Sequence, residues 1–224
     1  MFVHTLYTWL ADCLFPIHCL GCGQTGAWLC RQCHHAIQLT PRPIPVDVPL
    51  DGVFALTTYD QPIIHALIHT AKYNGIGAIA DTLGSIMTEA LLRIDKSAAS
   101  RILHVPETSI VPVPLHRRRF CERGFNQSER IARLVATAFA MPLMSQALKR
   151  ARYTGQQAQM NRAERWKNME EAFTIGVDFK KTLKNVILID DVATTTATLA
   201  ACATVLKRHG VHRVWGLVLA HGNS

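Results

Sequence analysis

The apolar residues of this chain fall into two patterns that alternate along the sequence. Short alternating or continuous apolar runs predict strands, and apolar positions spaced three or four residues apart predict helices. The predicted strands are residues 53–59, 109–114, 186–189 and 214–219, and the predicted helices are residues 64–71, 79–94, 126–140 and 198–209. Because strands that alternate with helices build parallel sheets, the pattern favours an α/β fold with a mainly parallel sheet flanked by helices.

The first forty residues depart from this pattern. Apolar residues at helical spacing predict a short amphipathic helix over residues 2–13, and four cysteines follow as two C-x2-C pairs, Cys19 with Cys22 and Cys30 with Cys33. Two such pairs can complete a tetrahedral shell of four thiolates, which is typical of a closed structural Zn²⁺ site. Three histidines lie nearby as alternative ligands: His18, His34 and His35.

A proline-rich stretch without periodicity follows this module and reads as a linker. The sequence therefore predicts three parts. Residues 1–40 form the N-terminal helix and zinc-binding module, residues 41–52 form the linker, and residues 53–224 form the main domain.

The predicted strand 186–189 leads into the segment with the most chemistry. Two acids, Asp190 and Asp191, are followed by Val192 and Ala193, and then by a turn and the start of a helix: Thr194, Thr195, Thr196, Ala197 and Thr198. Ligands of open α/β sheets bind at the carboxyl ends of strands, and N–H groups at the start of a helix favour anions. Carboxylates beside such a turn suit the hydroxyls and the phosphate of a phosphorylated sugar. The alternative is an ordinary buried strand that ends in solvated acids and a Thr-rich helix cap.

This segment resembles the motif that binds phosphoribosyl pyrophosphate (PRPP) in type I phosphoribosyltransferases, namely an apolar strand, two acids and a Thr-rich loop. The resemblance implies that Asp190 and Asp191 are the catalytic acids and that residues 192–198 bind substrate. Thr196 stands where that family usually has Gly. Because a β-branched residue is unfavourable at positive φ, we expect either weaker phosphate binding or a turn of different shape.

Two further segments carry cations suited to a pyrophosphate group. Lys72 and Tyr73 end a predicted helix and resemble the first phosphoribosyltransferase loop, which grips pyrophosphate. Alternatively, these residues only end a helix, and the Lys is favourable there because it lies near the negative pole of the helix dipole. Residues 115–126 read as a long basic loop, in which Arg119 and Arg123 can match phosphate oxygens bidentately.

VPVPLHRRRFCERGFNQSERIAR (residues 111–133), the four cysteines and DDVATTTAT together resemble the ComF family of competence proteins, also called GntX-like. The resemblance spans about residues 6–219. It implies a zinc finger joined to a phosphoribosyltransferase-like domain that binds PRPP with Mg²⁺ and acts on cytoplasmic single-stranded DNA in natural transformation. The acceptor of a transfer reaction stays open; residues 153–173 are the candidate for its pocket.

Composition narrows the class of partner without naming one. The net charge is +8 and the pI is about 9.3, which favours an anionic partner such as PRPP or nucleic acid. No apolar run reaches the length of a membrane span, so we expect no membrane insertion, and metal-like cysteine spacing fits a reducing cytoplasm. Two alternatives to a transferase remain. One is a PRPP sensor without turnover, and the other is a single-stranded-DNA-binding accessory that docks a helicase-like partner through its zinc module.

Overall fold

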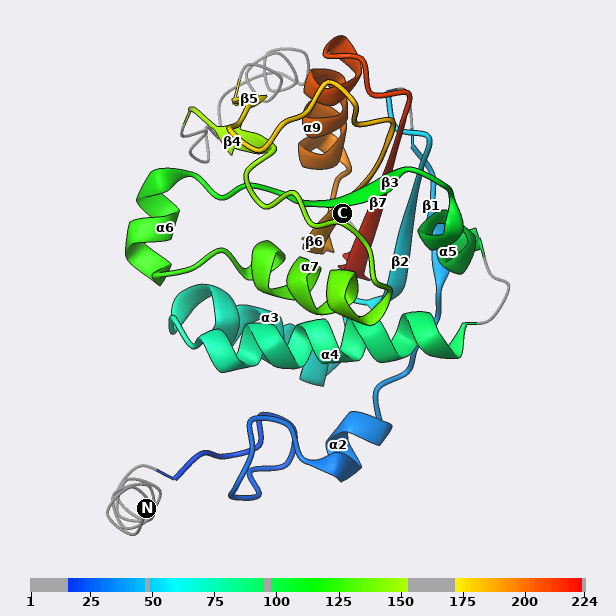
Figure 1. Cartoon of the computed structure of the whole chain (residues 1–224). Coiled ribbons are helices and arrows are strands. Elements are labelled where there is room, and N and C mark those ends of the chain that lie inside the picture. Colours follow the sequence, from blue (N-terminus) through cyan, green and yellow to red (C-terminus); the bar gives the residue numbers. More distant parts are fainter. Residues whose placement is uncertain (1–15, 47–48, 95–97, 153–171, 223–224) are drawn as a thin grey trace, which may run out of the picture.

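The protein is described by a computed structural model that covers residues 16–46, 49–94, 98–152 and 172–222 (Figure 1). The predicted helix over residues 2–13 and most of the predicted acceptor segment 153–173 lie outside these residues. The central sheet has five strands in the order β1-β2-β7-β6-β3. Its strands are β1 (Arg42–Ile44), β2 (Gly52–Thr58), β7 (Arg213–His221), β6 (Asn185–Ala193) and β3 (Thr108–Pro112). All neighbours pair in parallel except β1 with β2, so the predicted α/β fold is confirmed.

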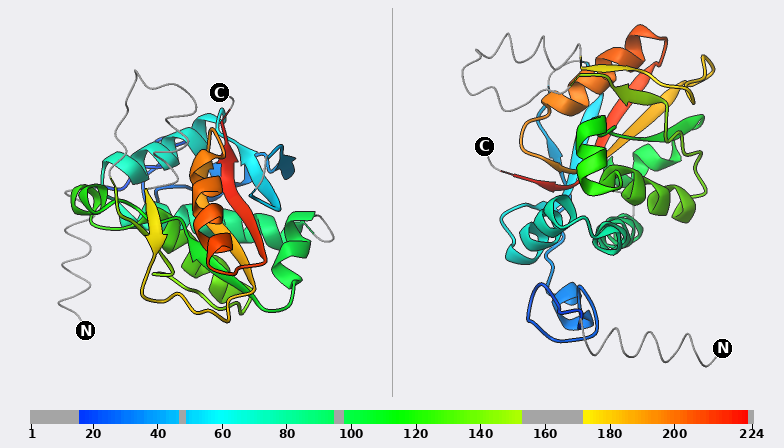
Figure 2. Two further views of the ribbon diagram at one scale, coloured as in Figure 1. Left: turned by 90° about the horizontal axis from the view of Figure 1, so that it is seen from above. Right: turned by 90° about the vertical axis from the view of Figure 1, so that its left-hand side faces the viewer.

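Helices cover both faces of the sheet (Figures 1 and 2). One face carries α3 (Pro62–Tyr73), α4 (Gly77–Arg93), α7 (Gln127–Ala138), the short α5 (Ala98–Arg101) and the 3-10 turn η1 (Ile102–His104). The other face carries α9 (Ala197–Arg208) and a small hairpin of β4 (Leu148–Arg150) and β5 (Phe173–Ile175). Because strand side chains alternate, Ile187 and Ile189 of β6 enter the first core and Val186 and Leu188 enter the second.

Two element boundaries differ from the sequence prediction in ways that matter for the site. Strand β6 continues through Ala193, so the paired acids belong to its carboxyl end instead of following it. Strand β1 lies inside the stretch read as a linker, and it pairs antiparallel with β2 from Arg42 to Ile44. Residues 41–52 are therefore partly built into the sheet edge. Three-residue strands such as β1, β4 and β5 are too short to show a hydrophobic period.

The basic segment that the sequence suggested was a loop is largely a helix, α6 (Arg117–Arg123). The His116 ring accepts a hydrogen bond from the Arg118 N–H at its start, and Gly124 ends it in the left-handed conformation, with φ 79°. Glu122 accepts hydrogen bonds from Arg118 and Arg119, four and three residues earlier. These pairings lower the repulsion between consecutive arginines, which explains why the segment is helical.

The N-terminal module, with its short helix α2 (Arg31–His35), packs below α3 and α4 (Figure 2). Three of its apolar residues, Leu20, Trp28 and Leu29, lie against the first core. The His34 ring approaches the Glu89 carboxylate of α4 at 3.1 Å, and the Thr57 hydroxyl donates to the Gln38 carbonyl. The module is thus held against the helices that lead to the carboxyl edge of the sheet. None of the helices described is both long and apolar enough to cross a membrane.

Candidate functional site

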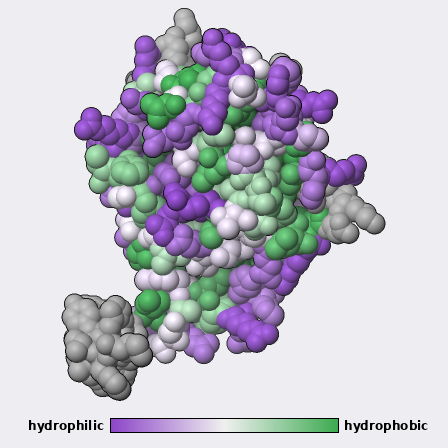
Figure 3. All heavy atoms as spheres, viewed as in Figure 1, coloured by the Kyte–Doolittle hydropathy of each residue, from purple (hydrophilic) through white to green (hydrophobic). Residues whose placement is uncertain are grey.

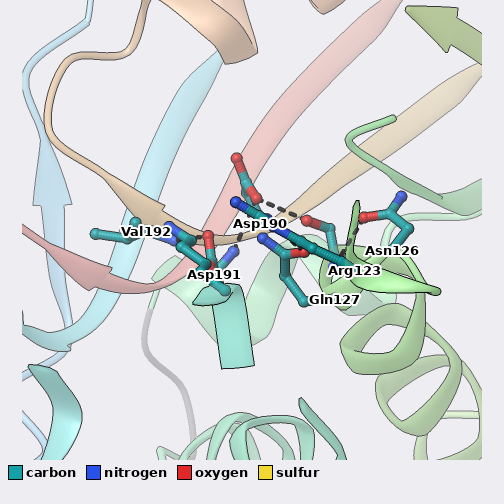
Figure 4. A network of polar contacts seen from close by, with 8 residues as sticks. Arg123, Asn126, Gln127, Asp190, Asp191 and Val192 are labelled. Carbon is teal, nitrogen blue, oxygen red and sulfur yellow. Dashed lines mark hydrogen bonds and ion pairs between the residues drawn. The ribbon is translucent and has the colours of Figure 1, made fainter. Parts of the chain in front are cut away.

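Two adjacent carboxylates lie at the carboxyl end of β6, and they leave the strand on opposite sides (Figure 4). Asp191 is buried, and its Oδ1 accepts a hydrogen bond from the Val192 N–H at 2.8 Å. Its Oδ2 faces the Lys72 ammonium at 3.0 Å and accepts no hydrogen bond of good geometry from the described residues. Lys72 and Asp191, which stand far apart in the sequence, therefore form one charged pair.

Asp190 has different surroundings. Its Oδ1 accepts a hydrogen bond from the Ser128 hydroxyl at 2.7 Å and another from the Asp191 N–H at 2.9 Å. Burial and the neighbouring charge of Asp191 raise the pKa of Asp190 to about 7, although Lys72 and the Ser128 hydrogen bond oppose the rise. Asp190 therefore takes up a proton near neutral pH, beside the ion pair of Lys72 with Asp191.

This pKa makes stability depend on pH in a defined direction. The folded state holds the Asp190 proton up to about pH 7, whereas an unfolded Asp loses it near pH 4, so the free energy of unfolding falls as pH rises through this window. Asp190→Asn should remove that fall and exceed the wild type by about 4 kcal/mol at pH 8, with no difference below about pH 4. Urea unfolding at several pH values measures this. Asp60→Asn, which removes an exposed carboxyl, is the control, and parallel curves for the wild type and Asp190→Asn would contradict the assignment.

Cations surround the acid pair from two helices. Burial alone would lower the pKa of Lys72, but the charges of Asp191 and Asp190 outweigh burial and raise this pKa above its usual value. The side chain of Arg123, at the end of α6, points toward the same acids and donates to the side-chain amide oxygen Oε1 of Gln127 at 3.0 Å (Figure 4). Burial lowers the pKa of Arg123, and the charge of Asp191 only partly opposes this. The guanidinium nevertheless stays charged at any physiological pH.

The Thr-rich turn joins the acids to α9. Thr194 and Thr195 are exposed, and Thr196 precedes the helix with φ −80° and ψ 5°. The turn therefore avoids positive φ at Thr196, which agrees with the expected alternative of a turn of different shape; among the described non-glycine residues only Glu107 and Ala140 have positive φ. No side chain caps this helix, so the N–H groups of its first turn are open to an anion.

The remaining predicted ligand residues lie around this centre with different exposure. Tyr73, at the end of α3, is 65% exposed, and its ring packs on His69 with centroids 4.6 Å apart. Arg119 donates to Glu122 on its own helix at 3.3 Å. The centre that the structure assembles is therefore Lys72, Asp190, Asp191 and Arg123, with Tyr73 and Arg119 at its edge.

The four cysteines form a second site, in the N-terminal module. Their sulfur atoms all lie within 4.8 Å of one another. The N–H groups of Gly21 and Cys30 point at the Cys19 sulfur, and an added Cβ on Gly21 would lie 2.7 Å from the Cys33 sulfur, so the turn closes tightly around the cluster. This arrangement fits a metal such as zinc, with Cys19, Cys22, Cys30 and Cys33 as its ligands.

The protonation of these thiols also fits a cation. Burial opposes ionisation of Cys19, but the backbone N–H groups outweigh burial and lower the pKa of this thiol to about 6. Burial and the three neighbouring thiols raise the pKa of Cys33 to about 12. A cation bound among the four sulfurs would offset the repulsion between neighbouring thiolates, because coordinated thiols lose their protons.

Comparison with known proteins gives related chains of similar length. The chain is 27% identical over 209 residues to Competence protein F of Haemophilus influenzae, covering 92% of this chain and 86% of that protein. It is 29% identical over 205 residues to DNA utilization protein YhgH of Escherichia coli K12, covering 89% of this chain and 87% of that protein. The Salmonella typhimurium protein of the same name is 29% identical over 201 residues, covering 89% and 82%. No protein-family model matches. These similarities support a ComF-like family for the chain.

The sequence alone missed one contact of this ComF-like chain. Ser128 reaches Asp190 because α7 begins at Gln127, where the Asn126 side chain caps the helix by accepting from the Ser128 N–H. Asn126 is itself fixed by donating to the Val113 carbonyl at 3.0 Å. The sequence does show that Asn126, within RGFNQS, can cap a helix and so place Ser128 in its first turn. It does not show that this turn lies beside the end of β6, because that depends on tertiary packing.

Proposed function

We propose that this chain binds PRPP at the carboxyl end of β6. The observation that carries the proposal is the 3.0 Å pair of Lys72 with Asp191, because it joins two segments that separately resemble parts of a phosphoribosyltransferase site. The open N–H groups at the start of α9 support it further, since they follow the acids directly.

In this proposal each part of the ligand meets groups of matching chemistry. The ribose hydroxyls donate to Asp190 and Asp191, and the 5′-phosphate lies in the turn of residues 192–198. The pyrophosphate lies near Lys72, Tyr73, Arg119 and Arg123, where the cations offset its charge. Mg²⁺, which prefers phosphate oxygens, waters and carboxylates, would accompany the pyrophosphate and has the two aspartates as its nearest protein oxygens in this arrangement.

We propose phosphoribosyl transfer as the activity, with an acceptor that the described residues do not define. As pyrophosphate leaves, positive charge develops on the ribose C1, and the negative Asp191 beside the sugar stabilises that charge. Lys72 and Arg123 stabilise the departing pyrophosphate from the other side. A sensor that binds PRPP without turnover would use the same contacts, and it differs only in lacking an acceptor.

The test is calorimetry with PRPP and Mg²⁺. The double substitution Asp190→Asn and Asp191→Asn keeps the shape of both side chains but removes the charge that orients Lys72, so we expect PRPP binding to be lost. Asp60→Asn with Asp178→Asn is the control for a similar loss of charge elsewhere. If the double variant of the acid pair binds PRPP as tightly as the wild type, the site is wrong.

The names of the relatives favour a process that handles DNA. We propose a role in DNA uptake, at the cytoplasmic single-stranded step of natural transformation. None of the six cysteines that the structure describes forms a disulfide, and four of them make up the metal-like cluster, which fits a reducing compartment. In this scheme residues 53–224 form the PRPP-binding domain, and residues 1–40 form a zinc module that docks a helicase-like partner, joined by residues 41–52.

An accessory that binds single-stranded DNA is the second candidate, favoured by the exposed arginines of α6. Its affinity for an oligonucleotide should fall steeply with salt, because phosphate contacts release counterions. The Asp190→Asn and Asp191→Asn double variant should keep this affinity, which separates the two functions.

A further inference from the structure

We infer that a pocket between α4, α6 and α7 holds an unpaired nucleobase. The pocket has a volume of about 360 Å³, within the range of small-ligand sites, and neither Asp190 nor Asp191 lines it. Its apolar lining comes from Phe120, Phe125 and Leu134, and its polar lining from Asp81, Glu129, Arg130 and Arg133.

The aromatic rings of the pocket are available to a ligand. Phe120, on α6, is 47% exposed and is one of few large apolar side chains that the described surface leaves open to solvent. Phe125 is partly exposed, and the Arg130 guanidinium lies over its ring at 5.6 Å from the centroid. A flat ring that enters here meets π faces and a cation, the combination on which bases stack in single-strand-binding proteins.

The cations of the pocket are held in place. Arg130 is fixed by two hydrogen bonds to the Asp81 carboxylate of α4, and its guanidinium also packs on Gly77, where a Cβ would lie 3.0 Å away. Arg133 donates to Glu129 at 3.0 Å, and both side chains reach solvent at the rim. The Arg133–Glu129 pair thus presents donors and acceptors to the hydrogen-bonding edge of a base.

Charge around the pocket favours a nucleotide over an aromatic side chain of a protein partner. Hydrophilic side chains crowd the surface over α6 and the adjoining start of α7 (Figure 3). Arginines 117, 118 and 119 lie on the helix that carries Phe120, so phosphates on either side of a bound base would meet positive charge. A protein side chain would bring no such charge.

Among the residues that the structure describes, Phe120 and Phe125 are the aromatic side chains that line this pocket, whereas Trp28 packs against the first core. The inference does not rest on PRPP binding, because none of the acid-pair residues lines the pocket. The two sites share helix α6: Phe120 lines the pocket, Arg123 interacts with Asp191, and Arg119 is a proposed phosphate contact for both.

Fluorescence anisotropy of the full, zinc-loaded chain tests the pocket with two labelled probes of equal charge. One is a 20-nucleotide oligo-dT, and the other is an abasic strand of the same length. Phe120→Ala should weaken oligo-dT binding about tenfold, since removing one stacking side chain costs roughly that much, and should leave the abasic strand unchanged. Leu92→Ala is the matched control, because Leu92 is also an exposed apolar residue but lies on α4 and does not line the pocket. Equal affinity of the wild type for both strands, or equal effects of Phe120→Ala on both, would overturn the inference.

Photocrosslinking then locates the base and separates its two sources. A strand with one 5-iododeoxyuridine and free 5-iododeoxyuridine monophosphate are each irradiated with the protein, and the modified peptides are mapped. Labelling of Phe120 or Phe125 by both probes means that a free nucleotide suffices, and labelling by the strand alone means that a base within a strand is held there. Crosslinks confined to other segments, or no crosslink from either probe, contradict the pocket.

Discussion

Replacing Lys72 by Met should lower the free energy of unfolding by about 3–5 kcal/mol. The Lys72 side chain is 21% exposed and the Asp191 side chain only 3%, so the substitution leaves a carboxylate in the interior without its cation. The Asp191 Oδ2 has no other hydrogen bond from the described residues to compensate. Chemical unfolding in urea at pH 7 measures the loss.

A double-mutant cycle shows whether the loss belongs to the pair. Combining Lys72→Met with Asp191→Asn removes both charges, so the double variant should recover most of the stability that Lys72→Met loses. Arg118→Met breaks an exposed pair with Glu122, whose side chains are 66% and 43% exposed, and should cost less than about 1 kcal/mol. A Lys72→Met cost no larger than that of Arg118→Met would show that the Lys72–Asp191 pair contributes little.

This pair also links stability to the proposed ligand. Lys72 can meet either Asp191 or a phosphate oxygen, and a sugar hydroxyl can replace the ammonium as the donor to Asp191. Binding of PRPP would therefore exchange one partner for another without leaving either charge unpaired. If PRPP binds as proposed, the pair with Lys72 holds the Asp191 carboxylate ready for the sugar before the ligand arrives.

The sequence located the chemistry of the site but not its assembly. The strand, the paired acids and the Thr-rich turn are contiguous, so their order alone predicts a carboxyl-edge site. Lys72 was predicted as a phosphate ligand, but its contact with Asp191 depends on how α3 packs on the sheet. Ser128 was not predicted, because a helix-capping residue gives no local sign that its neighbour will reach a carboxylate 62 positions away.

Local physics explains the other differences. For Thr196 two outcomes were expected, weaker phosphate binding or a turn of different shape, and the negative φ of Thr196 agrees with the second. Segment 117–123 was predicted to be a loop because of its charge, whereas pairing with Glu122 and the stop at Gly124 make it helical. That prediction was wrong because it weighed the charge of the arginines and not their pairing along a helix.

Removing the metal from the four-cysteine module should unfold that module. Purified reduced protein should contain about one zinc per chain, and Cys22→Ser should reduce the content to near zero. Structural zinc sites in finger peptides contribute about 10–16 kcal/mol of apparent binding free energy at neutral pH, far more than so short a segment can supply from its own packing. Hydrogen exchange should then lose protection at the Cys19 and Leu20 amides, which donate to Gln24 and Trp28 within the module.

Loss of the metal should also lower the stability of the main domain, but by less than it lowers that of the module. Leu20, Trp28 and Leu29 cover part of the first core, so their release exposes apolar surface on α3 and α4 and should lower the melting temperature by several degrees without abolishing the fold. Cys121→Ser, at an exposed cysteine outside the cluster, is the matched control and should change neither zinc content nor protection. Fresh reduced protein without zinc, or a Cys22→Ser variant that keeps full amide protection, would show that the module folds without a metal.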